Sequence, residues 1–291
     1  MQLSKDLNLI FLIVVTLIFF SLNSIFCKVA LSYDYIDAYS FTFLRVFFAC
    51  ITLILLVLFK SKELTFSFKS NWLSSFMLFI YLIGFSYAYL GMDAGFGALL
   101  LFGTVQIVMI ISSFFRKESI SVLKIIGVIV AFLGLVYLLL PKEQFEISYF
   151  HVALMVLSGM GWAGYSILGK SSNDALFNTM DNFLKATFFV MITFSVLFVD
   201  SLNISFDGFV FAFLSGSLTS AIGYMIWYFI LPKIQVFTAS VVQLFVPIIA
   251  VLLSVLFLDE IFTYDILVSI LLISVGVVLA VIPKREANQS I

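Results

Sequence analysis

Apolar positions dominate the chain in long runs, and short polar connections separate them. Ten runs can be marked, at residues 7–31, 37–59, 72–92, 95–115, 122–140, 150–169, 178–199, 208–231, 236–257 and 265–282. Each is close to the roughly 20 residues that an α-helix needs to cross the hydrocarbon core of a bilayer. The pattern therefore predicts an all-α integral membrane protein with ten transmembrane helices.

Polar and glycine residues in and between these runs recur at an offset of 140 or 142 positions. Glu118 falls on Glu260, and Gly134 on Gly276, after a shift of 142 positions. The same shift lays residues 24–28 on 166–170, and a shift of 140 lays 43–45 on 183–185. Such self-similarity indicates a duplicated unit. We expect two five-helix repeats, residues 1–143 and 144–291.

Lysine and arginine set the expected orientation, because basic residues concentrate in cytoplasmic loops. If the N-terminus is cytoplasmic, Lys142 is the one basic residue in the outer loops. The inner loops then hold eleven: Lys5, Lys60, Lys62, Lys69, Arg116, Lys117, Lys124, Lys170, Lys233, Lys284 and Arg285. Both termini should be cytoplasmic. Since five is odd, the second repeat should be inverted, with a central cavity between the halves.

Composition supports a lipid environment and excludes several classes of protein. The chain is 63% hydrophobic and 11% charged, and its mean hydropathy is +1.22, which does not fit a soluble domain of 291 residues. A net charge of −1 argues against nucleic-acid binding. The two cysteines, Cys27 and Cys50, lie inside apolar runs, so neither a disulfide nor a metal site is expected. We expect no cofactor.

Several short motifs complete the pattern. They are residues 21–24 with Lys28, 43–45, 161–163, 221–224 with 227–228, and 243–247 running on to Glu260. Together with the ten-span repeat, they resemble the drug/metabolite transporter superfamily, in particular its EamA family. The resemblance implies a ten-helix bundle that moves small metabolites, often amino acids or related compounds and frequently outward. Gln106 stands near where the fourth span of the family often has proline, and Asp181-Asn182 at the start of span 7 also departs from the pattern.

Residues 164–171 match the phosphate-binding pattern G-x-x-x-x-G-K-[ST]. That pattern binds phosphate only as a loop between a strand and a helix. Here it ends a predicted membrane helix, so we interpret it as a chance match.

Basic residues within the spans are the first candidates for a substrate site. Arg45 lies eight residues past Asp37, about 12 Å along a helix, which is deep for snorkelling. It could face the cavity and receive an anionic group, pair with an acid, or partly snorkel. Lys185 lies four residues after Asp181 and can pair with it along one helix face or contribute to the cavity. Lys28, near the end of span 1, is expected to snorkel, and a role in the cavity is the less favoured alternative.

Aromatic residues are the second group of candidates. Tyr224, Trp227 and Tyr228 share one helix face, and Trp162 and Tyr165 share another. These faces could stack against a substrate. Ordinary packing is the competing interpretation in a chain that is 18% aromatic.

Buried amides form the third group, because an amide in hydrocarbon needs a hydrogen-bond partner. Asn23, Gln106 and Gln243 are the candidates. Gln243 precedes Pro247 by one turn, and proline frees the carbonyl four residues earlier. This predicts either a local break that lines the site or a simple kink.

These features favour a secondary transporter that is not driven by ATP and works by alternating access. The expected partners are a small-molecule substrate, carboxylate-bearing or amphipathic, and the lipid bilayer of the cytoplasmic membrane, and we expect export. Proton coupling is weakly supported because no acid sits at mid-membrane, so exchange or flow down a gradient stays open. The alternatives are a membrane enzyme, for which the lone His151 offers little, and a structural membrane protein.

Overall fold

The computed structural model describes residues 2–61, 72–91, 94–139, 148–193, 202–257 and 262–281. In these ranges every regular element is helical, apart from one isolated bridge between Ile36 and Ile204. The first half contains α1 (Gln2–Ser32), α2 (Ala38–Ser61), α3 (Trp72–Ala88), α4 (Ala94–Phe115) and α5 (Val122–Leu139). The second half contains α6 (Tyr149–Gly169), α7 (Ala175–Thr193), α8 (Phe206–Leu214), η1 (Ser215–Ile222), α9 (Gly223–Ile230), η2 (Leu231–Lys233), α10 (Val236–Val242), α11 (Phe245–Phe257) and α12 (Tyr264–Val281). The predicted all-α class is confirmed.

The helices have the length and surface of membrane spans. Within the described ranges, eight helical stretches are long and apolar enough to cross a bilayer. The other two predicted spans correspond to α3, which has 17 residues, and to α7, which carries Asp181 and Lys185. Large apolar side chains such as Phe11, Phe114 and Phe188 are more than half exposed on the outside of the bundle. Such a surface is stable only against lipid.

The predicted limits differ from the observed ones mainly at the ends. Helix α1 begins five residues before the predicted start at residue 7, because the polar residues near the N-terminus continue the helix. The predicted end of span 7, at residue 199, lies outside the described residues. Glu260 also lies outside them.

Two spans of the second half depart from a regular α-helix. The eighth contains η1, a π-helical segment that brings Ser215, Thr219 and Ser220 into the interior. π-Helical turns are rare and often occur at functional sites. The ninth is divided between α10 and α11, and the Val246 N–H donates to the Gln243 carbonyl across the break (3.0 Å). The break predicted from Gln243 and Pro247 is therefore present.

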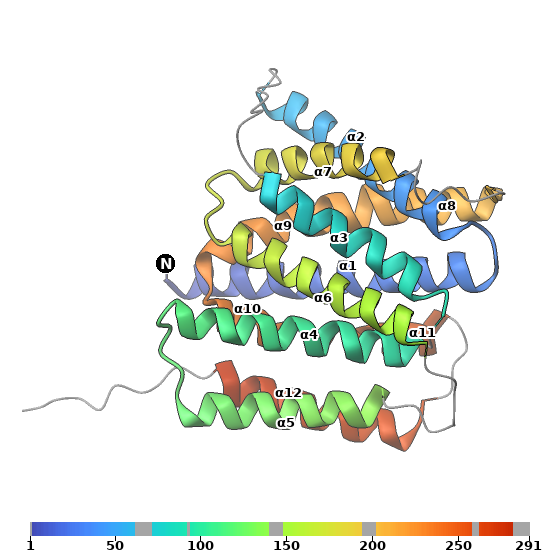
Figure 1. Ribbon diagram of the computed structural model, residues 1–291. Helices are drawn as coiled ribbons and strands as arrows, with labels where there is room; N and C mark the ends of the chain where they lie inside the picture. Colours follow the sequence, from blue (N-terminus) through green and yellow to red (C-terminus); the bar gives the residue numbers. More distant parts are fainter. Residues whose placement is uncertain are drawn as a thin grey trace, which may run out of the picture.

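The two halves run in opposite directions, as helices α5 and α12 show (Figure 1). A Cβ atom added to Gly127 would lie 2.5 Å from the Gly276 carbonyl oxygen, and one added to Gly134 would lie 2.8 Å from the Leu272 Cβ. Moving forward along α5 thus means moving backward along α12. Because Gly134 and Gly276 are equivalent positions of the repeat, the repeat is inverted.

The other contacts between the two halves follow the same symmetry of the inverted repeat. Helix α2 packs against its counterpart α7, and Figure 1 shows this pair along the edge of the bundle opposite α5 and α12. Helix α3 packs on α6, and correspondingly η1 and α9 pack on α1. Four spans from the two halves, α1, α3, α6 and η1–α9, therefore meet in the middle of the bundle.

Candidate functional site

A fully buried guanidinium lies where these central helices meet. Arg45, on α2, is 0% exposed. Its Nε donates to the Ser220 hydroxyl of η1 (2.9 Å), and its Nη2 donates to the hydroxyls of Tyr224 (2.6 Å) and, at the limit of hydrogen bonding, Tyr81 (3.5 Å). We call these four residues the Arg45 site. The snorkelling alternative for Arg45 is wrong, since water does not reach it.

No carboxylate among the described residues pairs with Arg45, and its Nη1 has no hydrogen-bond partner there. Burying an unpaired charge costs several kcal/mol. The neutral hydroxyl groups around Arg45 offset part of that cost, but they leave the N–H groups of Nη1 without an acceptor. The arrangement can accept a further oxygen ligand, and an anionic one most favourably.

The equivalent cation of the second half, Lys185, has its own counter-ion. Its Nζ donates to the Asp181 carboxylate (2.6 Å), and both side chains are buried. The predicted pairing along the helix face is confirmed. The residue at the corresponding place before Arg45 is Phe41. Of these two related cations, Lys185 is therefore compensated by an acid within its own helix and Arg45 is not.

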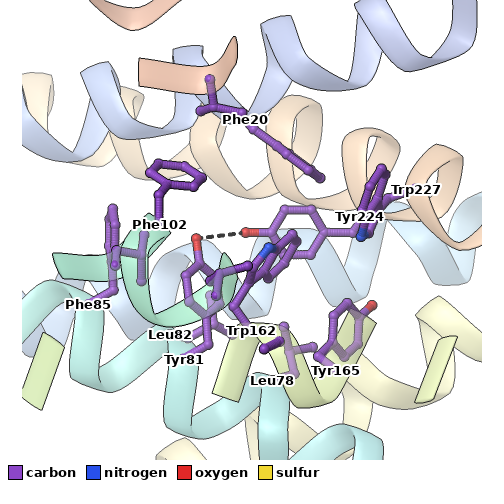
Figure 2. Packing of buried hydrophobic residues seen from close by; sticks show 14 of the residues in the cluster. Phe20, Leu78, Tyr81, Leu82, Phe85, Phe102, Trp162, Tyr165, Tyr224 and Trp227 are labelled. Atoms are coloured by element: carbon purple, nitrogen blue, oxygen red, sulfur yellow. Dashed lines mark hydrogen bonds between the residues drawn. The ribbon is translucent and has the colours of Figure 1, made fainter. Parts of the chain in front are cut away.

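Tyr81 and Tyr224 are themselves related by the repeat, because they lie 143 positions apart and belong to equivalent spans. Tyr224 donates to Tyr81 (3.2 Å), the contact drawn dashed in Figure 2. Around them the rings of Phe20 and Trp162 pack with centroids 5.1 Å apart, and Trp162 lies 4.9 Å from both Tyr81 and Tyr224. Aromatic side chains therefore enclose the Arg45 site on one side.

A small cavity adjoins this aromatic group. Its volume is about 20 Å³, enough for about one water molecule. Asn23, Trp162 and Tyr224 line it, so the structure brings three of the predicted residues together here, and Tyr81 also lines it. The centre of the bundle is nearly closed in this conformation.

A larger cavity of about 220 Å³ lies next to it, at the end of the bundle where α1 and α5 end. The two cavities share Ser24, Leu101, Phe102 and Val246 as lining residues. Lys28 lines the larger one, which we call the Lys28 cavity. Lys28 is half-buried at this end of the bundle, a position that fits both the expected snorkelling and the alternative cavity role.

On the opposite side of the Arg45 site, polar side chains close the bundle. The hydroxyls of Tyr228 and Ser74 are hydrogen-bonded (2.6 Å), and Tyr228 also donates to the Tyr165 carbonyl (3.1 Å). Trp227 donates to Ser166 (3.1 Å). Tyr228 lines a third cavity of about 210 Å³, which Ser171 and Ser172 border just past the end of α6. Cavities thus approach the centre from both ends.

The predicted amides have different surroundings. Asn23 accepts from Ser215 (2.6 Å) and Thr219 (3.2 Å) of η1. Gln243 accepts from Trp162 (2.6 Å) and donates to the Ala239 carbonyl (2.8 Å). Gln106 is 3% exposed, and its Nε2 has no partner among the described residues. Six of the predicted cavity residues are buried but line none of the cavities described here: Arg45, Gln106, Tyr165, Lys185, Trp227 and Gln243.

The phosphate-binding pattern has no phosphate-binding geometry. Residues 164–169 belong to α6, so their backbone N–H groups are committed to the helix. The Lys170 ammonium donates to the Ile234 carbonyl. Burial lowers the pKa of Lys170, and the carboxylate of Glu118 opposes that shift. The interpretation as a chance match fits this geometry.

Sequence reasoning missed Tyr81 and Ser220. Tyr81 could have been found, because it aligns with Tyr224 once the repeat offset is applied to the third and eighth spans. Ser220 could not, because the π-helical turn that directs it to Arg45 has no sequence signature.

Comparison of the sequence with known protein families agrees with this architecture. Residues 7–140 and 150–282 each match the EamA-like transporter family. The chain belongs to that family. It is therefore a multi-pass membrane transporter with two repeated halves.

Relatives of this EamA-like transporter occur in distant organisms. An uncharacterised protein of Pseudomonas aeruginosa is 36% identical over 88% of each chain. YoaV, an uncharacterised transporter of Bacillus subtilis, is 25% identical over 81% of this chain and 85% of its own. A solved crystal structure matches with a TM-score of 0.75 at 16% identity, over 91% of this chain and 97% of that one, and so shares the fold.

Proposed function

We propose that this EamA-like transporter exports small carboxylate-bearing or amphipathic metabolites, amino acids and related compounds among them, without ATP and by alternating access. Residues 1–143 and 144–291 are the two moving units, both termini are cytoplasmic, and the protein lies in the cytoplasmic membrane. The expected partners are the metabolite and the bilayer.

One observation carries the proposal: Arg45 is buried at the junction of the two halves without a carboxylate partner in the described chain. A carboxylate supplied by a substrate would satisfy Nη1 and compensate the charge. Charge-assisted hydrogen bonds of this kind contribute about 1.5–3 kcal/mol each. The contrast with Lys185, which Asp181 compensates, indicates that the lack of a counter-ion at Arg45 is specific to that position.

The remaining predicted residues support the site in different ways. Asn23, Trp162 and Tyr224 line the small central cavity, and Tyr165, Trp227 and Tyr228 close the bundle beyond it. Gln243 orients Trp162 through its side-chain amide. Transport is proposed in preference to catalysis because both halves of the chain match a transporter family.

The test is counterflow into proteoliposomes, with a panel of labelled amino acids and monocarboxylates. We expect saturable counterflow for at least one carboxylate. Arg45→Gln should reduce it about tenfold or more, Arg45→Lys should reduce it less, and Arg116→Gln should leave it unchanged because Arg116 is an exposed arginine. Unchanged counterflow in Arg45→Gln, with normal membrane insertion, would refute the role of Arg45.

A further inference from the structure

We infer that Asn23 is a specificity-determining residue next to the Arg45 site. Its side-chain amide selects substrates that present a hydrogen-bond acceptor, such as a carboxylate, and disfavours substrates that present an ammonium group. The inference rests on the proposed function and narrows its substrate class. It assigns part of the selection to a neutral residue on α1, in addition to the charge of Arg45.

The orientation of the Asn23 amide is set by the π-helical segment η1. Its side-chain oxygen accepts from the hydroxyls of Ser215 (2.6 Å) and Thr219 (3.2 Å). The next residue of η1, Ser220, accepts from the Nε of Arg45 (2.9 Å). One segment therefore positions both the amide and the guanidinium. With its oxygen committed to η1, the amide has its nitrogen, which carries two donors, left for other contacts.

Two hydrogen-bond donors at the small central cavity have no acceptor in the described part of the chain. Asn23 lines this cavity, and its Nδ2 makes no hydrogen bond to a described residue. Tyr81 also lines it, and its hydroxyl oxygen accepts from Tyr224 (3.2 Å) and Arg45 (3.5 Å). The hydroxyl proton of Tyr81 is thus unused among the described residues. Both donors are available to an acceptor that enters the cavity.

The other walls provide no anionic group for an ammonium. Phe20, Phe85 and Phe102 are among them, and Figure 2 shows these side chains near the dashed hydrogen bond. The described lining contains no carboxylate. An ammonium group would enter a low-dielectric space close to the Arg45 guanidinium, where like charges repel. A carboxylate would gain hydrogen bonds from the unused donors instead.

The cavity has room for about one water molecule in this closed conformation. A substrate enters it only when the halves move apart in the proposed transport cycle. The donors are already held in place by the hydrogen bonds of Asn23 and Tyr81, so little ordering is needed when the leading group of the substrate arrives.

Replacing Asn23 with aspartate tests the role of the amide nitrogen. Aspartate has nearly the same shape and keeps an acceptor for Ser215 and Thr219, but it offers an acceptor where asparagine has donors. Binding of 4-methylpentanoate and 4-methylpentylamine is measured from the thermal stabilisation of the purified full chain in nanodiscs. We expect the unmodified protein to bind the carboxylate at least tenfold more tightly than the amine.

Asn23→Asp should weaken binding of the carboxylate about tenfold and strengthen binding of the amine. Asn23→Leu, which removes the donors without adding a charge, should weaken the carboxylate and leave the amine unchanged. The matched control is Asn173→Asp at an exposed asparagine, which should alter neither. A purely structural role of Asn23 would change the binding of both probes in the same direction.

An unchanged ratio of carboxylate to amine binding in Asn23→Asp would overturn the inference. So would equal binding of the two probes by the unmodified protein, or no binding of either. Counterflow in Arg45→Gln tests the proposed function separately, because it measures transport and not the preference between probes. Loss of counterflow in Arg45→Gln together with an unchanged ratio in Asn23→Asp would refute the role of Asn23 alone.

Discussion

The hydroxyl groups of Tyr81 and Tyr224 lie 3.2 Å apart, although the two residues belong to different halves of the chain. They are equivalent positions of an inverted repeat, so their contact lies near the axis that relates the halves. Both also reach the guanidinium of Arg45. A movement of one half against the other must therefore act on the same hydrogen bonds that hold this cation.

Removing the Tyr224 hydroxyl should destabilise the protein more than removing the Tyr81 hydroxyl. Arg45 Nη2 lies 2.6 Å from Tyr224 but 3.5 Å from Tyr81, and a buried donor that loses its partner costs about 1–3 kcal/mol. We expect Tyr224→Phe to lower the free energy of unfolding by that amount in a detergent titration. Tyr81→Phe should lower it less, and the exposed Tyr33→Phe should have no effect. The reverse order would contradict the assigned hydrogen bonds.

Asp181 and Lys185 should show strong coupling in a double-mutant cycle. Removing one member of a buried ion pair typically costs about 3–5 kcal/mol, because the other charge remains buried. Asp181→Asn and Lys185→Met should each be destabilising, and the double variant should recover much of the loss. Additive losses in the cycle would show that the pair contributes no mutual stabilisation.

A methyl group at Gly276 should push α5 and α12 apart. Its Cβ would lie 2.4 Å from the Ala131 backbone nitrogen and 2.5 Å from the Gly127 carbonyl oxygen. Overpacking of this kind costs about 1–3 kcal/mol, which a thermal-unfolding scan of Gly276→Ala would detect. Gly103→Ala is the matched control, because its nearest neighbour would be 3.4 Å away on the Phe132 ring. Equal melting temperatures for the two variants would contradict close contact at this seam.

Glu118 should act as the N-terminal cap of α10. Its carboxylate oxygens accept from the backbone N–H groups of Val236 (2.8 Å) and Phe237 (2.9 Å). Loss of a helix cap costs about 0.5–2 kcal/mol. We expect Glu118→Ala to show the full loss of unfolding free energy and Glu118→Gln a smaller one, since glutamine keeps one acceptor oxygen. No loss in Glu118→Ala would exclude the capping role.

The orientation can be tested by cysteine labelling in intact cells. The native Cys27 and Cys50 are buried, so they give a low background. Tyr33→Cys, after α1, should react with a membrane-impermeant maleimide from outside, whereas Ser61→Cys, at the end of α2, should react only after permeabilisation. The opposite pattern would place the termini outside the cell.

The sequence could predict features that depend on local patterns or on the repeat. Ten apolar runs and the match of Gly134 with Gly276 were enough to predict inverted halves. The length of a run and the offset of a repeat can be read from the sequence without knowing any spatial contact. The surroundings of Arg45 depend on contacts with Tyr81 and Ser220, which are 36 and 175 positions away in sequence. A helical pattern records which face of its own helix a residue occupies, but it does not record which distant hydroxyl meets that face.

The close backbone contact between α5 and α12 has a mechanical consequence. Sliding or tilting of one helix against the other would open the space between their glycines, so we expect the final helices of the two halves to stay in contact. The α5–α12 pair lies along one edge of the bundle, and α2 with α7 lies along the other (Figure 1). Rotation of the halves would therefore leave the glycine edge almost stationary and reach its greatest amplitude around α2 and α7.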